Sequence, residues 1–264
     1  MASYFGVMRA ALVGAGLLVP AAVSSTAIAA EPAKPAVLES VELFQAMEDG
    51  AIDVQFIPRD ATEARVLIEN KTDKPLNVRL PAAFAAVPVL AQFGGGGGGG
   101  GFGGGGGGGG QGMGGGMGGM GGGGMGGGGM GGGGGGGFFN VAPEKVANFK
   151  VACVCLDHGK PDPTPRMQYK LVPVESYVSN QAVIELLKQF GRGGLDRSIA
   201  QAATWHLNNG LSWQELAAKR SGRKSLLGRE EPYFYPQQLH AAVQLSKAAE
   251  QFAAKQDGSS LSQK

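Results

Sequence analysis

One feature limits the possible folds of this chain more than any other: a stretch of 44 residues, Gly94 to Gly137, of which 37 are glycine. Its other residues are Phe102, Gln111 and five methionines. Such a segment buries too little apolar surface to offset the conformational entropy that folding removes, so we predict a disordered Gly/Met-rich insert over 94–137. No Gly-Lys-Ser/Thr follows the glycines, which excludes a phosphate-binding loop, and the strict three-residue period of collagen is missing.

Segments with alternating hydrophobicity flank the insert on both sides. Before it, IDVQFIP, ARVLIEN, PLNVRLP and VPVLAQF are typical of strands; after it, FFNVAPEKVANFKVACVCL alternates again. The insert is therefore predicted to be an oversized loop inside one β domain, because lengthening a loop from ~4 to ~44 residues costs only about 2 kcal/mol. Short strands with turn signals favour a small antiparallel immunoglobulin-like β-sandwich, here over 51–93 and 138–178.

The hydrophobic period becomes helical towards the C-terminus, which makes the predicted fold class α+β. About four helices are expected over 179–255, among them one with an S-x-x-E capping box at Ser212 and one that begins at Pro236. A further short helix is predicted within the leader segment 31–50, and the polar tail 256–264 is expected to be disordered. The helices are amphipathic and too short to be stable alone, so we expect them to pack against the sandwich.

The first thirty residues carry the pattern of a secretory signal peptide. Arg9 precedes an apolar run, and small residues follow with Ala27 and Ala29 in an A-x-A arrangement. We therefore predict a signal peptide over 1–30 and a secreted, periplasmic or cell-envelope location. An N-terminal membrane anchor is the alternative, although the run is shorter than the ~20 residues that a membrane span needs. No second apolar run of that length follows, so no transmembrane segment is expected after removal of the signal.

The charges of the chain are nearly balanced, with 23 Lys and Arg residues against 21 Asp and Glu residues. This balance gives no general attraction to nucleic acid, so nucleic-acid partners are not expected. A local basic cluster, KRSGRK over 219–224, is interpreted as a solvated loop. The expected partner is an unknown protein or surface.

The sequence lacks the common catalytic signatures: H-E-x-x-H, G-x-S-x-G, a phosphate-binding loop and a dinucleotide-binding fingerprint. Its three histidines, His158, His206 and His240, are far apart and show no metal-ligand spacing. We therefore predict a non-enzymatic protein without a cofactor, with a structural or adhesive function in the cell envelope or the extracellular space.

The only two cysteines, Cys153 and Cys155, stand one residue apart in ACVCLDHGKPDP. The simplest interpretation is two small hydrophobic side chains facing the core. A disulfide between them would distort the strand, because residues i and i+2 of a strand lie close to the upper Cα–Cα limit for bridging. A metal site with His158, and with Asp157 or Asp162, stays open as a weaker alternative. Thioethers bind cuprous ion, so metal handling would also involve the methionines at positions 113, 117, 120, 125 and 130.

Two motifs, VCLDHGKPDP and IAQAATWHLNNG, give residues 150–213 a local resemblance to the thioester domain of bacterial surface adhesins. The resemblance implies that Cys155 supplies the thiol and Gln201 the acyl group of an internal thioester that captures amines, with Trp205 packed near the bond. Ala200 stands where that family has threonine, and Val154 where an aromatic residue commonly precedes the cysteine. Ordinary helix packing of Gln201 and Trp205, four residues apart, is the alternative.

A second resemblance is broader. The run from Leu43 to Gln92 and the segment WHLNNGLSWQELAAK are similar to exported proteins of planctomycete-type bacteria. That family carries no activity that can be transferred to this chain.

Overall fold

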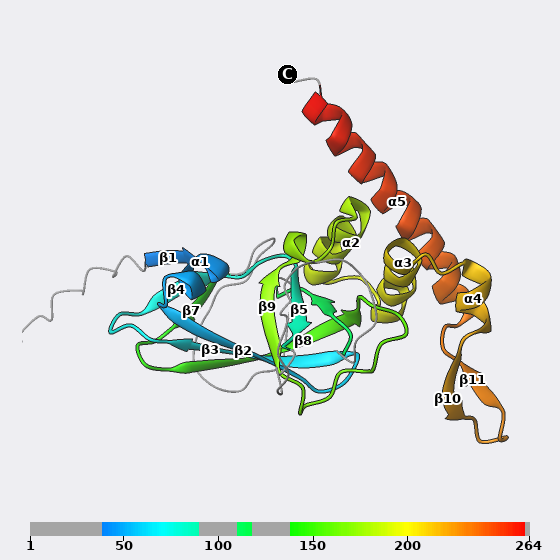
Figure 1. Ribbon diagram of the computed structural model, residues 1–264, viewed down its shortest axis with the longest axis horizontal. Helices are drawn as coiled ribbons and strands as arrows, with labels where there is room; N and C mark the ends of the chain where they lie inside the picture. Colours follow the sequence, from blue (N-terminus) through cyan, green and yellow to red (C-terminus); the bar gives the residue numbers. More distant parts are fainter. Residues whose placement is uncertain (1–38, 90–109, 118–137, 262–264) are drawn as a thin grey trace, which may run out of the picture. The chain divides into compact units, whose positions relative to one another are not determined.

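The computed structural model describes residues 39–89, 110–117 and 138–261 of the chain. The predicted signal peptide and the first part of the leader segment lie outside these ranges. Figure 1 shows the described elements: a group of strands rolled into a barrel, a smaller sheet, a set of helices and a two-stranded hairpin. The α+β class is confirmed.

Six antiparallel strands form a closed barrel in the order β2-β3-β8-β6-β5-β9. Their side chains follow the period of two that a strand requires: along β3, Ala64, Val66 and Ile68 are fully buried while the residues between them are not. The strands are β2 (Ile52–Pro58), β3 (Glu63–Asn70), β5 (Phe84–Pro88), β6 (Met113–Gly115), β8 (Val146–Cys155) and β9 (Tyr169–Pro173). The predicted immunoglobulin-like β-sandwich is wrong, because a sandwich needs two separate sheets and this sheet closes on itself.

The strand that closes the barrel, β6, comes from the glycine-rich tract. It pairs with β5 on one side and with β8 on the other, so that Gly115 lies between Phe84 and Cys153. The disordered insert predicted over 94–137 therefore does not extend to residues 110–117, whereas the remainder of the tract lies outside the described residues. Hydrophobic periodicity could not identify β6, because glycines carry no side chain whose burial would mark a face.

Close packing explains why glycines occupy this segment. A Cβ atom added to Gly115 would lie 2.8 Å from the ring of Phe84. At Gly116 the added atom would overlap the carbonyl oxygen of Ala82 and the backbone of Gly191 on a neighbouring helix. Glycine therefore lets the backbone of this segment pass between the barrel and the helix at a distance that no side chain would allow.

A second sheet and a short helix share the core of the barrel interior. The strands and the helix are β1 (Glu39–Glu42), β4 (Leu76–Arg79), β7 (Phe138–Val141) and α1 (Leu43–Glu48). β1 pairs with β4 in parallel, and β4 pairs with β7 antiparallel. Leu43, Val78 and Val141 are buried in the same hydrophobic core as Phe56 of the barrel. The helix predicted in the leader is shorter than expected, because the residues before it pair as a strand.

Four helices follow the barrel within the described part, as predicted for the C-terminal segment. They are α2 (Gln181–Gly191), α3 (Arg197–Asn209), α4 (Trp213–Ala218) and α5 (Pro236–Leu261), preceded by the 3-10 turn η1 (Val174–Ser176). Side chains of Asn180, Asp196 and Ser212 cap the first three at their starts. The helices α2, α3 and α5 bury their apolar faces against one another and against β8, forming a second hydrophobic core.

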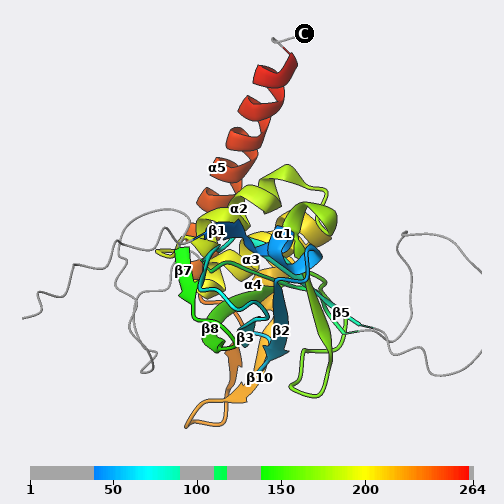
Figure 2. The same cartoon turned by 90° about the vertical axis from the view of Figure 1, so that its left-hand side faces the viewer.

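Two further features lie at the C-terminal end. A hairpin of β10 (Arg220–Lys224) and β11 (Glu230–Pro232) connects α4 to α5 and includes most of the region expected to be a solvated loop. Figures 1 and 2 show the hairpin projecting away from α5. α5 continues through Leu261, so the tail expected to be disordered is helical as far as that residue. Within the described residues, none of the helices combines the length and apolar character that crossing a membrane requires.

Candidate functional site

The carboxamide of Gln201, on α3, binds the main chain of Cys155 at the end of β8. The backbone N–H of Cys155 donates to Oε1 of Gln201 at 2.8 Å, and Nε2 of Gln201 donates to the carbonyl oxygen of Cys155 at 2.8 Å. Gln201 is completely buried. The carboxamide supplies one acceptor and one donor, as the main chain of a neighbouring strand would. It therefore satisfies both the N–H and the C=O of Cys155 in a place that water does not reach.

The need for this contact arises where β3 ends. β3 pairs with β8 from Glu69 back to Glu63, and the carbonyl oxygen of Thr62 then accepts from the N–H of Cys153 at 2.8 Å. In an antiparallel ladder the N–H and C=O groups of alternate residues point to the same neighbouring strand. After Cys153, the next residue of β8 whose N–H and C=O point to the β3 side is therefore Cys155. Gln201 takes the place of the strand at this position. The structure thus brings together the two residues of the thioester hypothesis, through the main chain of the cysteine.

Both cysteines are free and buried, as expected for small core side chains. Sγ of Cys155 lies 3.7 Å from the carbonyl oxygen of Ala61. Burial, and then the negative charge of Asp162, raise the pKa of the Cys155 thiol to about 12, and burial also raises the pKa of the Cys153 thiol. Both thiols are therefore protonated at neutral pH, which lowers their nucleophilicity and their affinity for metals.

Trp205, one helical turn after Gln201, is buried in the second hydrophobic core. Its ring centroid lies 5.5 Å from that of Tyr233 and 5.8 Å from that of Phe234. Its exposed fraction is 4%. Both ordinary packing and a role beside a thioester bond would bury Trp205, so these contacts do not distinguish the two interpretations.

His158 is held by aromatic and cationic neighbours. Its ring lies edge to face against Trp205 with the centroids 4.8 Å apart, and its Nε2 lies 3.0 Å from Nζ of Lys219. The ammonium of Lys219 also lies over the rings of Trp205 and Tyr233, at 5.2 and 5.4 Å from their centroids. Because an ammonium group only donates, Nε2 of His158 accepts and the imidazole is neutral. Burial and then the charge of Lys219 lower the pKa of His158 accordingly.

The metal hypothesis stays a prediction. The part of the chain that the structure describes contains no group of three or more His, Cys, Asp and Glu side chains that could hold a metal ion. Met113 lies opposite Cys155 in the register of β6 and β8, and both Met113 and Met117 are buried. The methionines at 120, 125 and 130 lie outside the described residues.

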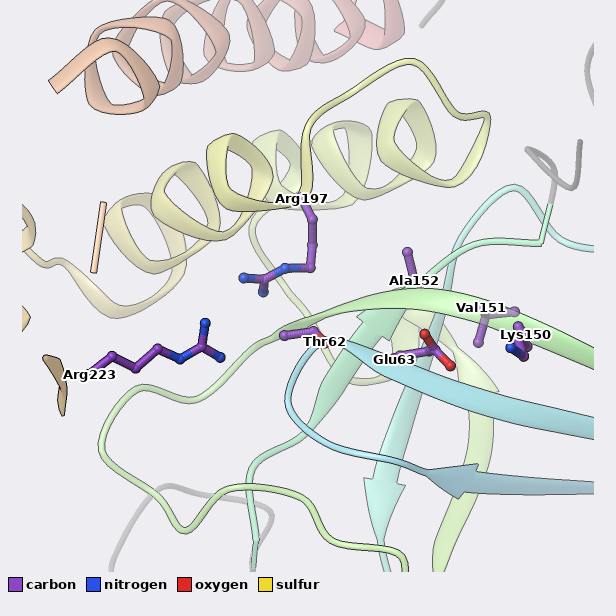
Figure 3. A pocket seen from close by; sticks show the side chains of 7 residues that line it. All are labelled: Thr62, Glu63, Lys150, Val151, Ala152, Arg197 and Arg223. Carbon is purple, nitrogen blue, oxygen red and sulfur yellow. The ribbon is translucent and has the colours of Figure 1, made fainter. Parts of the chain in front are cut away.

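A shallow cavity of about 380 Å³ opens where α3, β8, the start of β3 and the hairpin meet (Figure 3). Arg197, the first residue of α3, and Arg223 of β10 extend towards each other from different sides of it, near Thr62. Glu63 and Lys150 lie together at the other end. Three cations and one carboxylate thus give the cavity a basic character.

The turn of the β10–β11 hairpin exposes two adjacent leucines. Leu226 and Leu227 are 107% and 86% exposed, more than any other large apolar residue in the described ranges. The N–H of Gly228 donates to the carbonyl oxygen of Ser225 at 2.9 Å. The N–H of Ser225 donates to the carbonyl oxygen of Arg229 at 2.8 Å. Gly228 adopts a φ of 73°, a conformation that favours glycine. The leucines are therefore presented by an ordered turn.

Comparisons of the chain with protein-family models, with curated proteins and with solved structures found no match. The family resemblances of the sequence therefore stay predictions, and function has to be argued from the site itself. Sequence reasoning identified Cys155 and Gln201 but missed the cavity and the leucine pair. The Leu-Leu-Gly run between two basic residues was the available signal for the exposed turn.

Proposed function

We propose that this chain is an exported, non-enzymatic adhesive protein of the cell envelope, which attaches to an anionic lipid surface through the tip of the β10–β11 hairpin. The observation that carries the proposal is the exposure of Leu226 and Leu227 at the turn. Turn positions usually hold glycine or polar residues, and two solvated leucines contribute nothing to folding. Burial against a surface outside the chain gives them a role.

The charges of the hairpin favour an anionic lipid surface over an apolar protein partner. The hairpin carries four cations and two carboxylates: Arg220, Arg223, Lys224, Arg229, Glu230 and Glu231. Lys224 and Arg229 stand close to the leucines on either side of the turn. Among the described residues, none of the four cations takes part in an ion pair. Apolar side chains that enter the acyl boundary beside Lys and Arg side chains at the headgroups are typical of peripheral membrane binding.

Cosedimentation of the mature chain with vesicles tests this function. We expect binding to vesicles that contain phosphatidylglycerol, weaker binding at high salt, and little binding to vesicles of phosphatidylcholine alone. Replacing both leucines with serine (L226S/L227S) should weaken binding by about 100-fold or more, since each buried leucine contributes about 1.5–3 kcal/mol.

Phe252→Ser is the matched control for the double variant. Phe252 is also an exposed apolar residue, at 43%, but it lies on α5 far along the sequence from the hairpin. We expect this variant to bind as the wild type does. Equal binding by L226S/L227S and the wild type would contradict the proposal.

Covalent adhesion through a Cys155–Gln201 thioester is a second candidate, which the contact between the two residues favours. In this reaction the sulfur of Cys155 attacks the carboxamide carbon of Gln201, the carbon–nitrogen bond breaks, and ammonia leaves with the thiol proton. A primary amine on the target would then displace the sulfur, forming an amide and restoring the thiol. The raised pKa of Cys155 and the two hydrogen bonds of Gln201 oppose the first step, so it requires a rearrangement at this contact.

The intact mass of the unreduced mature protein tests the thioester candidate. A mass lower than calculated by one ammonia, which disappears in Gln201→Ala once the substitution is allowed for, supports the thioester. A mass lower by two hydrogens indicates a disulfide instead. The mass of the free-thiol chain contradicts the thioester and leaves the lipid-binding proposal untouched.

A further inference from the structure

Arg197 and Arg223 enter the cavity of Figure 3 without an acidic partner. Among the described residues neither guanidinium takes part in an ion pair. Nη1 of Arg197 is buried and has no hydrogen-bond partner in that part of the chain, although the same side chain is hydrogen-bonded to Tyr233. A guanidinium keeps its charge at physiological pH, so a buried, unpaired donor has lost its water without replacement. Nη1 is not accessible to solvent, so an acceptor in the cavity would remove that cost once the side chain of Arg197 turns towards it.

The carboxylates around the cavity are engaged elsewhere. Glu63, which lines the far end, pairs with Arg59 at 3.4 Å. Asp196 caps the first turn of α3 through its side-chain oxygen. Asp60 accepts hydrogen bonds from the backbone and the hydroxyl of Thr62. The chain therefore places two guanidinium groups on different sides of one opening and directs its own acids to other partners.

We propose that this cavity is a binding site for an oxyanion with three or four oxygens, a phosphate or sulfate group, held between Arg197 and Arg223. One guanidinium already satisfies the two oxygens of a carboxylate in a bidentate contact. Two guanidinium groups that approach from different sides match the larger number of acceptors on a phosphate or sulfate group. The cavity volume of about 380 Å³ leaves room for the remainder of a larger molecule, towards the end where Lys150 and Glu63 lie.

The phosphate group has two possible sources, a free anion and a lipid headgroup. Arg223 precedes Leu226 by three residues, or about 10 Å along an extended strand. If the leucines enter a lipid surface, the cavity lies within reach of the headgroups. The site itself does not depend on the lipid-binding function, because its two arginines and its unpaired donor are present in the chain alone.

Calorimetric titration of the mature protein with inorganic phosphate, at constant ionic strength, tests the site. We expect one saturable binding event that sulfate competes with and that Arg223→Gln weakens by about tenfold or more. Arg220→Gln is the matched control, because Arg220 is exposed on the same strand and does not line the cavity. Arg223 is exposed on the hairpin, so its variant should fold normally. Arg197→Gln repeats the test from the helix side, once its thermal unfolding midpoint is shown to match that of the wild type.

Vesicles containing phosphatidic acid separate the two sources. If a headgroup occupies the site, Arg223→Gln weakens vesicle binding more than Arg220→Gln does, although each removes one charge. If the ligand is a free anion, inorganic phosphate binds and the two variants bind vesicles equally. The proposal is overturned if phosphate shows no saturable binding and the two variants behave alike on vesicles. Loss of all vesicle binding, with phosphate binding retained, would reject the lipid function alone.

Discussion

Two short segments of this chain reverse the usual relation between residue type and burial. Residues 110–117, rich in glycine, lie inside the folded part, where Met113, Gly115 and their neighbours pair with two barrel strands. Residues 225–229 include two leucines, and both are almost completely exposed. The first segment is buried because its glycines let the backbone fit between neighbouring elements while Met113 and Met117 enter the core, whereas the second presents its side chains away from the chain.

The contrast separates residues that stabilise the fold, in the glycine segment, from residues that are available for binding, at the hairpin tip. In the glycine segment the barrel gains the strand that pairs with both β5 and β8, and at Gly115 and Gly116 there is no room for a side chain. At the hairpin tip the apolar side chains gain nothing from the fold, since they contact solvent. Substitutions in the first segment should therefore change stability, and substitutions in the second should change binding.

The largest effect is expected from Gly116→Ala. Its new Cβ atom would overlap the carbonyl oxygen of Ala82 and the backbone of Gly191, neither of which is the end of a flexible side chain. We expect the free energy of unfolding to fall by about 3 kcal/mol or more, at the upper end for overpacked cores. Urea denaturation followed by circular dichroism measures it.

Gly194→Ala is the control for that variant. Gly194 has a φ of 88° and open space where the methyl group of alanine would lie, so alanine there should cost only the backbone strain, about 1–2 kcal/mol. If Gly116→Ala were no more destabilising than Gly194→Ala, the glycine segment would not lie between the barrel and α2.

The next largest effect is expected from Gln201→Met, which keeps the length of the side chain but removes both hydrogen bonds. The N–H and C=O of Cys155 would be left buried without a partner, which should lower the free energy of unfolding by about 2–4 kcal/mol. Gln214→Met, at an exposed position on α4, should change it by less than about 0.5 kcal/mol. Similar values for the two variants would show that the paired contact does not support the end of β8.

The elements with side chains of clear period could be predicted from the sequence. The strand predicted at IDVQFIP coincides with β2, and the capping box at Ser212 forms as expected. The barrel could not be predicted, because its closure depends on β6, whose glycines carry no periodic signal. Without β6 the predicted strands could not close into a barrel, and an open immunoglobulin-like sandwich was predicted instead.

The candidate site was predictable only where a motif marked it. The helix motif pointed to Gln201, and the cysteine motif to Cys155, but no sequence rule indicates that the side chain of one binds the main chain of the other. The cavity combines Arg197 and Arg223, which come from separate elements and share no local pattern. Their pairing is a product of tertiary structure.

A smaller effect is expected from pH, through His158. Burial and the charge of Lys219 lower its pKa in the folded chain below the ordinary value of 6.5. The unfolded chain therefore binds the proton more readily, and stability should fall as the pH drops through 6.5 towards the folded-state pKa. The change should be modest because the ring is partly exposed. Thermal unfolding midpoints between about pH 7.5 and about pH 5 should fall less in His158→Gln than in the wild type, whereas His240→Gln, at an exposed position, should follow the wild type.

The smallest effect on stability is expected from L226S/L227S, although it removes two leucines. Both side chains are solvated, so the free energy of unfolding should change by less than about 0.5 kcal/mol. Met113→Ser, which removes one apolar side chain from the glycine segment, should lower it by about 2–5 kcal/mol because Met113 is completely buried. Urea denaturation of the two variants compares the segments directly. If the leucine variant were destabilised by more than about 1 kcal/mol, the leucines would pack on the chain in solution, and they would no longer be free to enter a lipid surface.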